Sequence, residues 1–279
     1  MRVKIITDSI SDLPKELIEK YNITVLPLYV TVGETTYRDG VDITADEMLA
    51  MTENGGTPKT AAVNMQDYLD AFSEALLEAD EVVHFCISAS MSACYQNACF
   101  AAEELGHIHV IDTENLSTGA GHLVLDACLL AQEGKSAGEI AAIINEKKKK
   151  VDASFVLTTL EYLRRGGRCS SLAAMGANLL RLHPCISVKD GAMGVGKKYR
   201  GNMKACLLEY VKDKLADPET IDPRRIFITD SGIDEEIRQA VREAVLELVP
   251  FEEVHHSRAG CTVSCHCGPG TLGILFYRK

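Results

Sequence analysis

Apolar residues along the first 150 positions form short runs that alternate with helical repeats. The runs, rich in β-branched and aromatic residues, predict strands at 3–7, 23–32, 82–87 and 107–111. Apolar residues at helical spacing predict helices between and after them, near 65–78, 98–105 and 116–132. A repeated strand–helix order is typical of a mainly parallel sheet with helices on both faces. We therefore expect an N-terminal three-layer α/β/α domain.

The pattern loosens after a lysine run at 147–150, which is typical of a solvated helix end. We take this run as a domain boundary and expect two domains, at 1–150 and 151–279. Shorter strands are predicted in the second part, at 154–157, 186–188, 193–199, 226–228, 254–257 and 273–277. We expect this part to be an α+β domain with a mixed or antiparallel sheet.

Composition narrows the class of protein. The chain has 279 residues, 46% of them hydrophobic, and a net charge of −11, which argues against unaided binding to nucleic acid or anionic membrane. No apolar run reaches ~18 residues, so we expect no integral membrane segment. Ten cysteines without a secretory signal predict reduced thiols and a cytoplasmic location.

Several motifs of known enzyme classes are missing. The chain has no G-x-x-x-x-G-K-[ST] phosphate loop and no G-x-G-x-x-G at its first strand–helix turn. It also lacks the G-x-S-x-G elbow of many hydrolases and the H-E-x-x-H zinc motif. We therefore expect no cofactor.

Three serines, Ser88, Ser90 and Ser92, lie between a predicted strand and the helix that follows it. A helix N-terminus presents free N–H groups and a positive dipole end, which suit an anion. The carboxyl ends of strands in an open α/β sheet are also common ligand sites. We interpret this turn as a candidate carboxylate or phosphate site. The alternative interpretation is that one serine only caps the helix.

His266 precedes Gly268-Pro269-Gly270, a sequence that forces a tight turn. A histidine fixed beside such a turn can donate to an anion or act as an acid or base. Alternatively, it is simply hydrogen-bonded within the turn.

Cys261, Cys265 and Cys267 invite a zinc interpretation, because Cys265 and Cys267 would lie on one side of an extended segment. The spacing forms no C-x-x-C pair, however, and a free cysteine is often a small buried hydrophobe. We therefore expect no metal ligands.

Three arginines surround a Gly-Gly pair at 164–168, and Arg200 follows the predicted hairpin. On an acidic chain, Arg168 and Arg200 are candidate partners for a carboxylate or phosphate, because a guanidinium binds both in bidentate geometry. Solvated surface arginines are the alternative.

Seven short motifs follow one another along essentially the whole chain. They lie at 5–9 with 12–14, 25–28, 37–40, 58–63, 92–96, 159–163 with 166–168, and 266–270. Examples are Thr7-Asp8-Ser9 and Tyr37-Arg38-Asp39-Gly40. In this order they resemble the DegV family of fatty-acid-binding proteins.

The resemblance implies a two-domain α/β protein that holds a long-chain fatty acid between or beneath its domains. It also implies the role of acyl-carrier subunit of a bacterial fatty acid kinase, in which a separate ATP-binding partner phosphorylates the carboxylate. By matching position, Thr60 and Ser92 would hydrogen-bond this carboxylate. His266 and Arg200 would complete its polar surroundings, and Arg168 would contact the substrate or the kinase partner.

The chain departs from the family pattern beside these residues. Ala61 replaces a serine after Thr60, and Ala93 and Cys94 replace the Gly-Thr that normally follows Ser92. His183 stands where the family commonly has lysine. These departures change the expected hydrogen bonding around the carboxylate.

Three functions are compatible with these residues. We favour a non-catalytic lipid-binding carrier, since a dry apolar tunnel with a few polar groups at one end suits a fatty acid. The first alternative is a standalone serine hydrolase with Ser92 as nucleophile and His266 as base. The second is a thiol or zinc sensor that uses the C-terminal cysteines.

Overall fold

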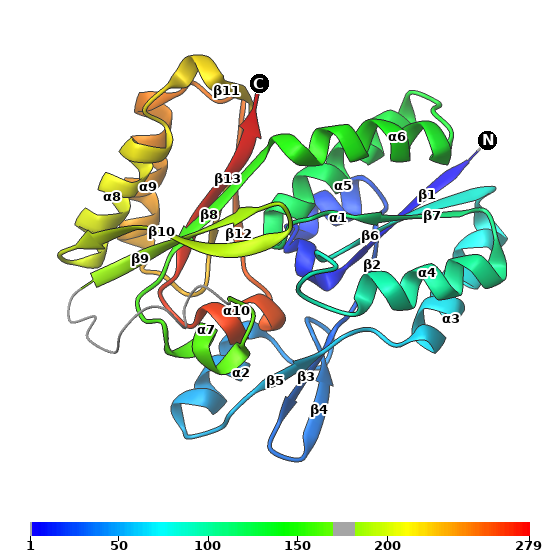
Figure 1. The fold of residues 1–279 in the computed structure, drawn as a ribbon, viewed down its shortest axis with the longest axis horizontal. Coiled ribbons are helices and arrows are strands. Elements are labelled where there is room, and N and C mark those ends of the chain that lie inside the picture. The colour runs from blue at the N-terminus through cyan, green and yellow to red at the C-terminus, as the bar shows by residue number, and fades with distance from the viewer. Residues whose placement is uncertain (1, 170–181) are drawn as a thin grey trace.

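The computed structural model describes residues 2–169 and 182–279 and arranges them around two β-sheets (Figure 1). The first sheet has four parallel strands in the order β2-β1-β6-β7. Their bounds are Val3–Asp8 (β1), Thr24–Leu26 (β2), Glu81–Cys86 (β6) and Ile108–Asp112 (β7). The predicted parallel sheet is confirmed.

Helices cover both faces of this sheet. On one face pack α3 and α4, and on the other α5 and α6 (Figure 1). The helices of this part are α1 (Lys15–Lys20), α3 (Met65–Glu78), α4 (Cys94–Leu105), α5 (Ser117–Gln132) and α6 (Ala137–Lys147). The three-layer α/β/α arrangement is thus also confirmed. None of the helices in the described ranges is both long and apolar enough to cross a membrane.

The second sheet has six strands in the order β10-β9-β8-β13-β11-β12. All neighbours are antiparallel except β11 and β12, so the predicted mixed sheet is confirmed. Its strands are β8 (Val151–Val156), β9 (Leu182–Lys189), β10 (Ala192–Arg200), β11 (Ile221–Asp230), β12 (Glu253–Arg258) and β13 (Leu272–Arg278). The other elements of this part are α7 (Glu161–Gly166), α8 (Met203–Lys214), α9 (Glu235–Leu248) and α10 (Cys261–Cys267).

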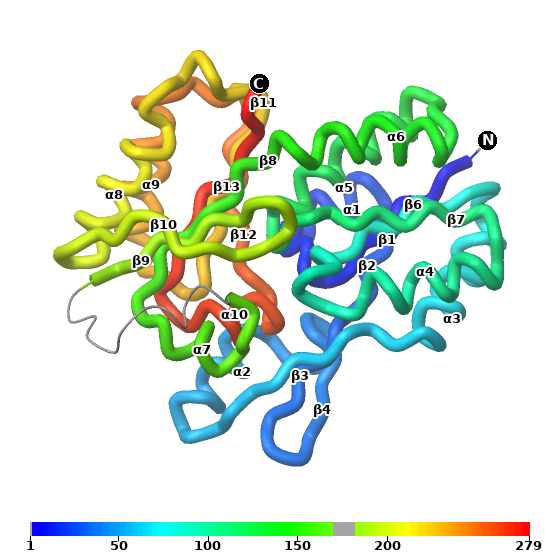
Figure 2. The backbone as a smooth tube through the Cα atoms, viewed as in Figure 1, coloured from blue at the N-terminus to red at the C-terminus, as the bar shows by residue number. Residues whose placement is uncertain are grey.

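A small third sheet, in the order β4-β3-β5, lies beside α10 and α2 (Figure 2). Its elements are β3 (Tyr29–Val32), β4 (Thr35–Arg38), β5 (Lys59–Ala61) and the adjacent helix α2 (Ala45–Glu53). Val30 and Met48 from this unit share a small core with Cys261 and Cys265 of α10. The chain's last helix therefore packs on one of its first sheets, and the division at residue 150 stays a prediction.

The continuous strand expected at 23–32 is wrong. The chain leaves the first sheet after β2 and enters the third sheet at β3. Pro27, which lies between them, has no N–H to donate to a sheet ladder. The next N–H, of Leu28, donates instead to Ser9 Oγ at 3.1 Å. The break at Pro27 thus sends the following strand to another sheet.

Candidate ligand-binding site

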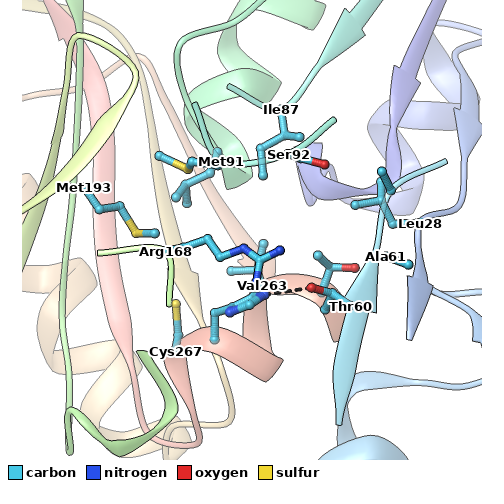
Figure 3. Close-up of a pocket in the computed structure, with 14 residues that line it drawn as sticks. Leu28, Thr60, Ala61, Ile87, Met91, Ser92, Arg168, Met193, Val263 and Cys267 are labelled. Carbon is cyan, nitrogen blue, oxygen red and sulfur yellow. Dashed lines mark hydrogen bonds between the residues drawn. The ribbon is translucent and has the colours of Figure 1, made fainter. Parts of the chain in front are cut away.

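A pocket lies where the carboxyl end of β6 in the first sheet, β10 of the second sheet, β5 of the third sheet and α10 meet (Figure 3). Its empty space, counted with the open mouth, is about 550 Å³. Most of its lining is apolar, from Leu28, Ala61, Ala62, Ile87, Met91, Leu116, Met193, Val263 and Cys267. Its polar side chains are those of Thr60, Ser92, Arg168, Thr262 and His266. Four of the five residues expected to bind a carboxylate are thus brought to one pocket.

The pocket adjoins two further hollows. On one side it shares Leu116, Val263 and Cys267 with a cavity whose lining also includes Phe155 and Leu275, with polar residues such as Thr229 and Asp230 among the rest; its empty space, counted with the open mouth, is about 330 Å³. On the other side it shares Thr60, Arg168 and His266 with an outer cleft whose empty space, counted in the same way, is about 1010 Å³. These three side chains therefore stand between the mostly apolar pocket and a cleft that carries the charged side chains of Lys59 and Arg165.

Helix α10 carries His266 into the pocket because carboxylates from the N-terminal part hold the start of this helix. Asp12 accepts the N–H of Gly260 at 2.8 Å, and Asp39 accepts those of Cys261 and Thr262 at 2.8 and 2.9 Å. Both carboxylates are buried. They satisfy N–H groups that have no partner within the helix. At the other end, Gly268 has φ +76° and ends the helix.

The extended segment expected around Cys265 and Cys267 is therefore wrong, because this stretch is helical. Cys261 and Cys265 face the small core with Val30, whereas Cys267 belongs to the main core and lines the pocket. In the described part of the chain, no group of three or more possible metal ligands includes any of these cysteines. The geometry gives the C-terminal thiol or zinc sensor no support.

Burial keeps His266 neutral. Its Nε2 and Thr60 Oγ1 form a hydrogen bond of 2.9 Å, while its Nδ1 is buried without a hydrogen-bond partner. Burial, with a smaller contribution from the positive charge of Arg168, lowers the pKa of His266 to about 4. A Cβ atom on Gly166 would lie 2.0 Å from Nδ1, so only glycine leaves room for the ring.

Arg168 brings a positive charge to the same place. Its side chain extends toward Thr60 (Figure 3), and its Nη1 donates to the Gly166 carbonyl at 2.7 Å. The residue is exposed, and it forms no ion pair with any carboxylate of the described residues. A guanidinium without an acidic partner beside a neutral histidine can receive an anion.

The three serines of the turn divide between two tasks. Ser88 and Ser90 both donate to the carbonyl of Gly191, at the tip of the β9–β10 hairpin, the first at 2.7 Å. Ser92 alone lines the pocket; its Oγ accepts the N–H of Cys94 at 3.3 Å and donates to the Cys94 thiol at 3.2 Å. The N-cap of α4 is Ala93, and no side chain forms a cap hydrogen bond there, so the interpretation that one serine caps this helix is wrong.

Arg200 and the hydrolase pair are placed differently from the other predicted residues. Arg200 is exposed at the end of β10 and does not line the pocket. Ser92 and His266 each have another hydrogen-bond partner, and no carboxylate orients His266 Nδ1. The arrangement of a serine nucleophile, a base and an orienting acid is not formed here.

The sequence reasoning missed the two carboxylates and the apolar lining. Asp12 and Asp39 stand in two of the seven motifs, but no role was assigned to them. Burial raises the pKa of Asp12 to about 8, although hydrogen bonds from Ser117 and Gly260 oppose this. Met91 and Met193 had only their hydrophobicity as a signal, which cannot separate a pocket from a core.

Comparison with known proteins gives one consistent result. Residues 2–279 match the family model described as "Uncharacterised protein, DegV family". A DegV domain-containing protein of Clostridium acetobutylicum is 34% identical over 283 residues, covering 100% of this chain and 99% of the relative.

Solved structures agree. One of a DegV family protein of Thermus thermophilus, described for fatty acid binding, has a TM-score of 0.92, 35% identity and 100% coverage of both chains. A stearic-acid-binding protein of Eubacterium ventriosum has a TM-score of 0.85 and 28% identity, covering 100% of this chain and 99% of its own.

The raised pKa of Asp12 predicts a specific pH dependence of stability. The folded protein keeps this proton up to about pH 8, whereas the unfolded chain releases it near pH 4. The free energy of unfolding should therefore fall as pH rises through this window, by up to ~1.4 kcal/mol per pH unit. The asparagine of Asp12→Asn cannot ionise. The free energy of unfolding of this variant, measured by urea denaturation, should therefore rise relative to that of the wild type from pH 5 to pH 8. Curves of unfolding free energy against pH that run parallel for Asp12→Asn and the wild type would contradict this assignment.

The close approach of Gly166 predicts the effect of one methyl group. Gly166→Ala should push the ring of His266 out of its buried place and break the hydrogen bond to Thr60. The pKa of His266, followed by NMR, should then rise from about 4 toward 6.5. The control is Gly194→Ala, because a Cβ there meets no atom within 4 Å. An unchanged titration in Gly166→Ala would show that the described packing is incorrect.

Proposed function

The chain belongs to the DegV family, and on that premise we propose that it binds a long-chain fatty acid and presents the carboxylate to a partner kinase. One observation carries the proposal. A mostly apolar pocket, adjoined by a cavity lined in part by Phe155 and Leu275, ends at Thr60, Arg168 and His266, beyond which lies a cleft that carries Lys59 and Arg165. A fatty acid has the same division between an apolar chain and a polar end. The fatty-acid-binding relatives support the same ligand class.

The acyl chain supplies most of the affinity in this proposal. Each buried CH₂ group contributes about 0.8 kcal/mol. We place the chain between Met91, Met193 and Val263, with its tail in the cavity lined by Phe155 and Leu275. The protein thereby shields the chain from water, and the polar end fixes its direction.

The carboxylate belongs at the polar boundary. Thr60 and Ser92 offer hydroxyl donors, and Arg168 offers the positive charge that a carboxylate needs when it leaves bulk water. The low pKa of His266 means that the ring is neutral near pH 7, so it can donate or accept a hydrogen bond without adding a second charge. The positive charge of Arg168 favours the ionised, nucleophilic form of the carboxylate.

The partner supplies ATP in this scheme, because the chain lacks the G-x-x-x-x-G-K-[ST] loop. A carboxylate oxygen attacks the γ-phosphorus of ATP, ADP leaves, and an acyl phosphate remains. The cleft beyond Thr60 contains Lys59 and Arg165, which suit the phosphate groups of the incoming nucleotide. Arg200, exposed outside the pocket, would meet the partner from the surface.

The ligand assignment is tested by extraction and by one substitution. Mass spectrometry of an organic extract of the purified protein should detect a long-chain fatty acid. Ser92→Ala should weaken binding by ~1–3 kcal/mol, about five- to 150-fold in Kd, because the carboxylate loses a buried partner. Ser90→Ala is the matched control, since Ser90 lies on the same turn but bonds the Gly191 carbonyl. Protein that binds no fatty acid, or equal affinity for both variants, would argue against the site.

The kinase role is tested separately. With an ATP-binding fatty acid kinase subunit, ATP and fatty acid, the wild type should yield acyl phosphate that hydroxylamine traps. Arg168→Gln should lower this yield at least tenfold while the acyl chain still binds, because the charge at the reacting carboxylate is lost. Arg242→Gln, on the exposed side of α9, should behave as the wild type. No acyl phosphate from the wild type would remove the kinase role and leave the binding role standing.

A further inference from the structure

A second group of polar side chains lies in the core of the first sheet, and the proposed function does not use it. Asp8 is the last residue of β1. Cys86 is the last residue of the neighbouring parallel strand β6, and His84 lies two residues before it on the same strand. All three are fully buried, with exposed fractions of 0%. Burying polar groups that lack partners costs free energy, so three buried ionisable groups side by side suggest a common ligand.

His84 is the most informative of the three. Both of its ring nitrogens are buried without a hydrogen-bond partner, and its ring is held edge-on to Tyr68 and Phe72, with centroids 5.1 and 5.2 Å away. Its Nε2 lies 3.3 Å from Asp8 Oδ1, but the two atoms do not have hydrogen-bond geometry. Two polar atoms that are close but not aimed at each other can share a third partner.

The spacing of the three ligand atoms suits such a partner. One atom each from Asp8, His84 and Cys86 lies within 4.8 Å of the other two. A tetrahedral zinc ion with Zn–N and Zn–O distances of about 2.1 Å sets neighbouring ligand atoms about 3.4 Å apart. The carboxylate is also held in place, by the Tyr68 hydroxyl at 2.8 Å and the Ile87 N–H at 3.3 Å. Such supporting bonds are usual around metal ligands.

We propose that Asp8, His84 and Cys86 bind one zinc ion. Mixed oxygen, nitrogen and sulfur donors suit zinc, and three protein ligands leave one of its four coordination positions open. On binding, the Cys86 thiol loses its proton to solvent and the thiolate coordinates the ion. The proposed site departs from the expectation that the chain has no metal ligands, and it does not involve the C-terminal cysteines.

Cys86 is followed directly by Ile87, a residue of the pocket lining. Besides burial, the negative charge of Asp8 raises the pKa of the thiols of Cys86 and Cys94, which a bound cation would reverse. The sulfur of Cys94 also accepts the hydrogen bond that the Ser92 hydroxyl donates. Zinc would thus join β1 to β6 and fix the turn that carries Ser92, whatever ligand the pocket holds.

Metal content tests the site without any fatty acid. Protein from zinc-supplemented cells should contain about one zinc per chain, and chelator-treated protein should recover it in competition with a chromophoric chelator. Cys86→Ser should weaken zinc binding more than tenfold. Cys128→Ser is the matched control, because Cys128 is a buried free cysteine outside the group. Wild-type protein that takes up no zinc, or equal zinc binding by both variants, would overturn the proposal.

Cobalt gives a second measurement that needs no folded variant. Co²⁺ added to zinc-free wild-type protein should give the intense visible bands of a tetrahedral site and a near-ultraviolet thiolate band. Excess zinc should abolish both. The weak spectrum of hydrated Co²⁺ would overturn the proposal even if the fatty-acid assignment holds.

Discussion

Helix α10 begins at two buried carboxylates that come from the other end of the chain. Asp12 and Asp39 accept its first N–H groups, across more than 200 residues of sequence. A helix of seven residues has little stability alone, so these bonds and its packing hold it in place. His266, Val263 and Cys267 all reach the pocket from this helix. The pocket therefore exists only where the two parts of the chain are docked.

The serine-rich turn supports the same docking from the opposite side. Ser88 and Ser90 hold the tip of the β9–β10 hairpin by its Gly191 carbonyl, which leaves Ser92 for the pocket. The hairpin also brings Met193 into the lining. Two hydroxyls that hold the hairpin and one that faces the pocket thus follow one another along a short turn. The contact between the first and second sheets and one polar group of the pocket therefore share a single segment.

Local patterns predicted the parallel sheet, the mixed sheet and the serine-rich turn that follows the strand at 82–87. They failed where distant partners decide, as at Cys265, whose segment is helical because remote carboxylates cap it. Motif matching singled out Thr60, Ser92, Arg168 and His266, which the fold brings to one pocket. It could not foresee that Arg200 lies outside, nor that Asp8 faces His84, because neither follows from spacing.

The central claim is that the apolar pocket holds an acyl chain whose carboxylate stops at Thr60, Ser92 and Arg168. A crystal structure of the protein with its copurified or added fatty acid tests this claim most directly. We expect the carboxylate to lie within hydrogen-bond distance of Thr60 Oγ1 and Ser92 Oγ, and the tail to lie beside Phe155 and Leu275. A chain bound in the reverse direction, or a ligand outside this pocket, would contradict it.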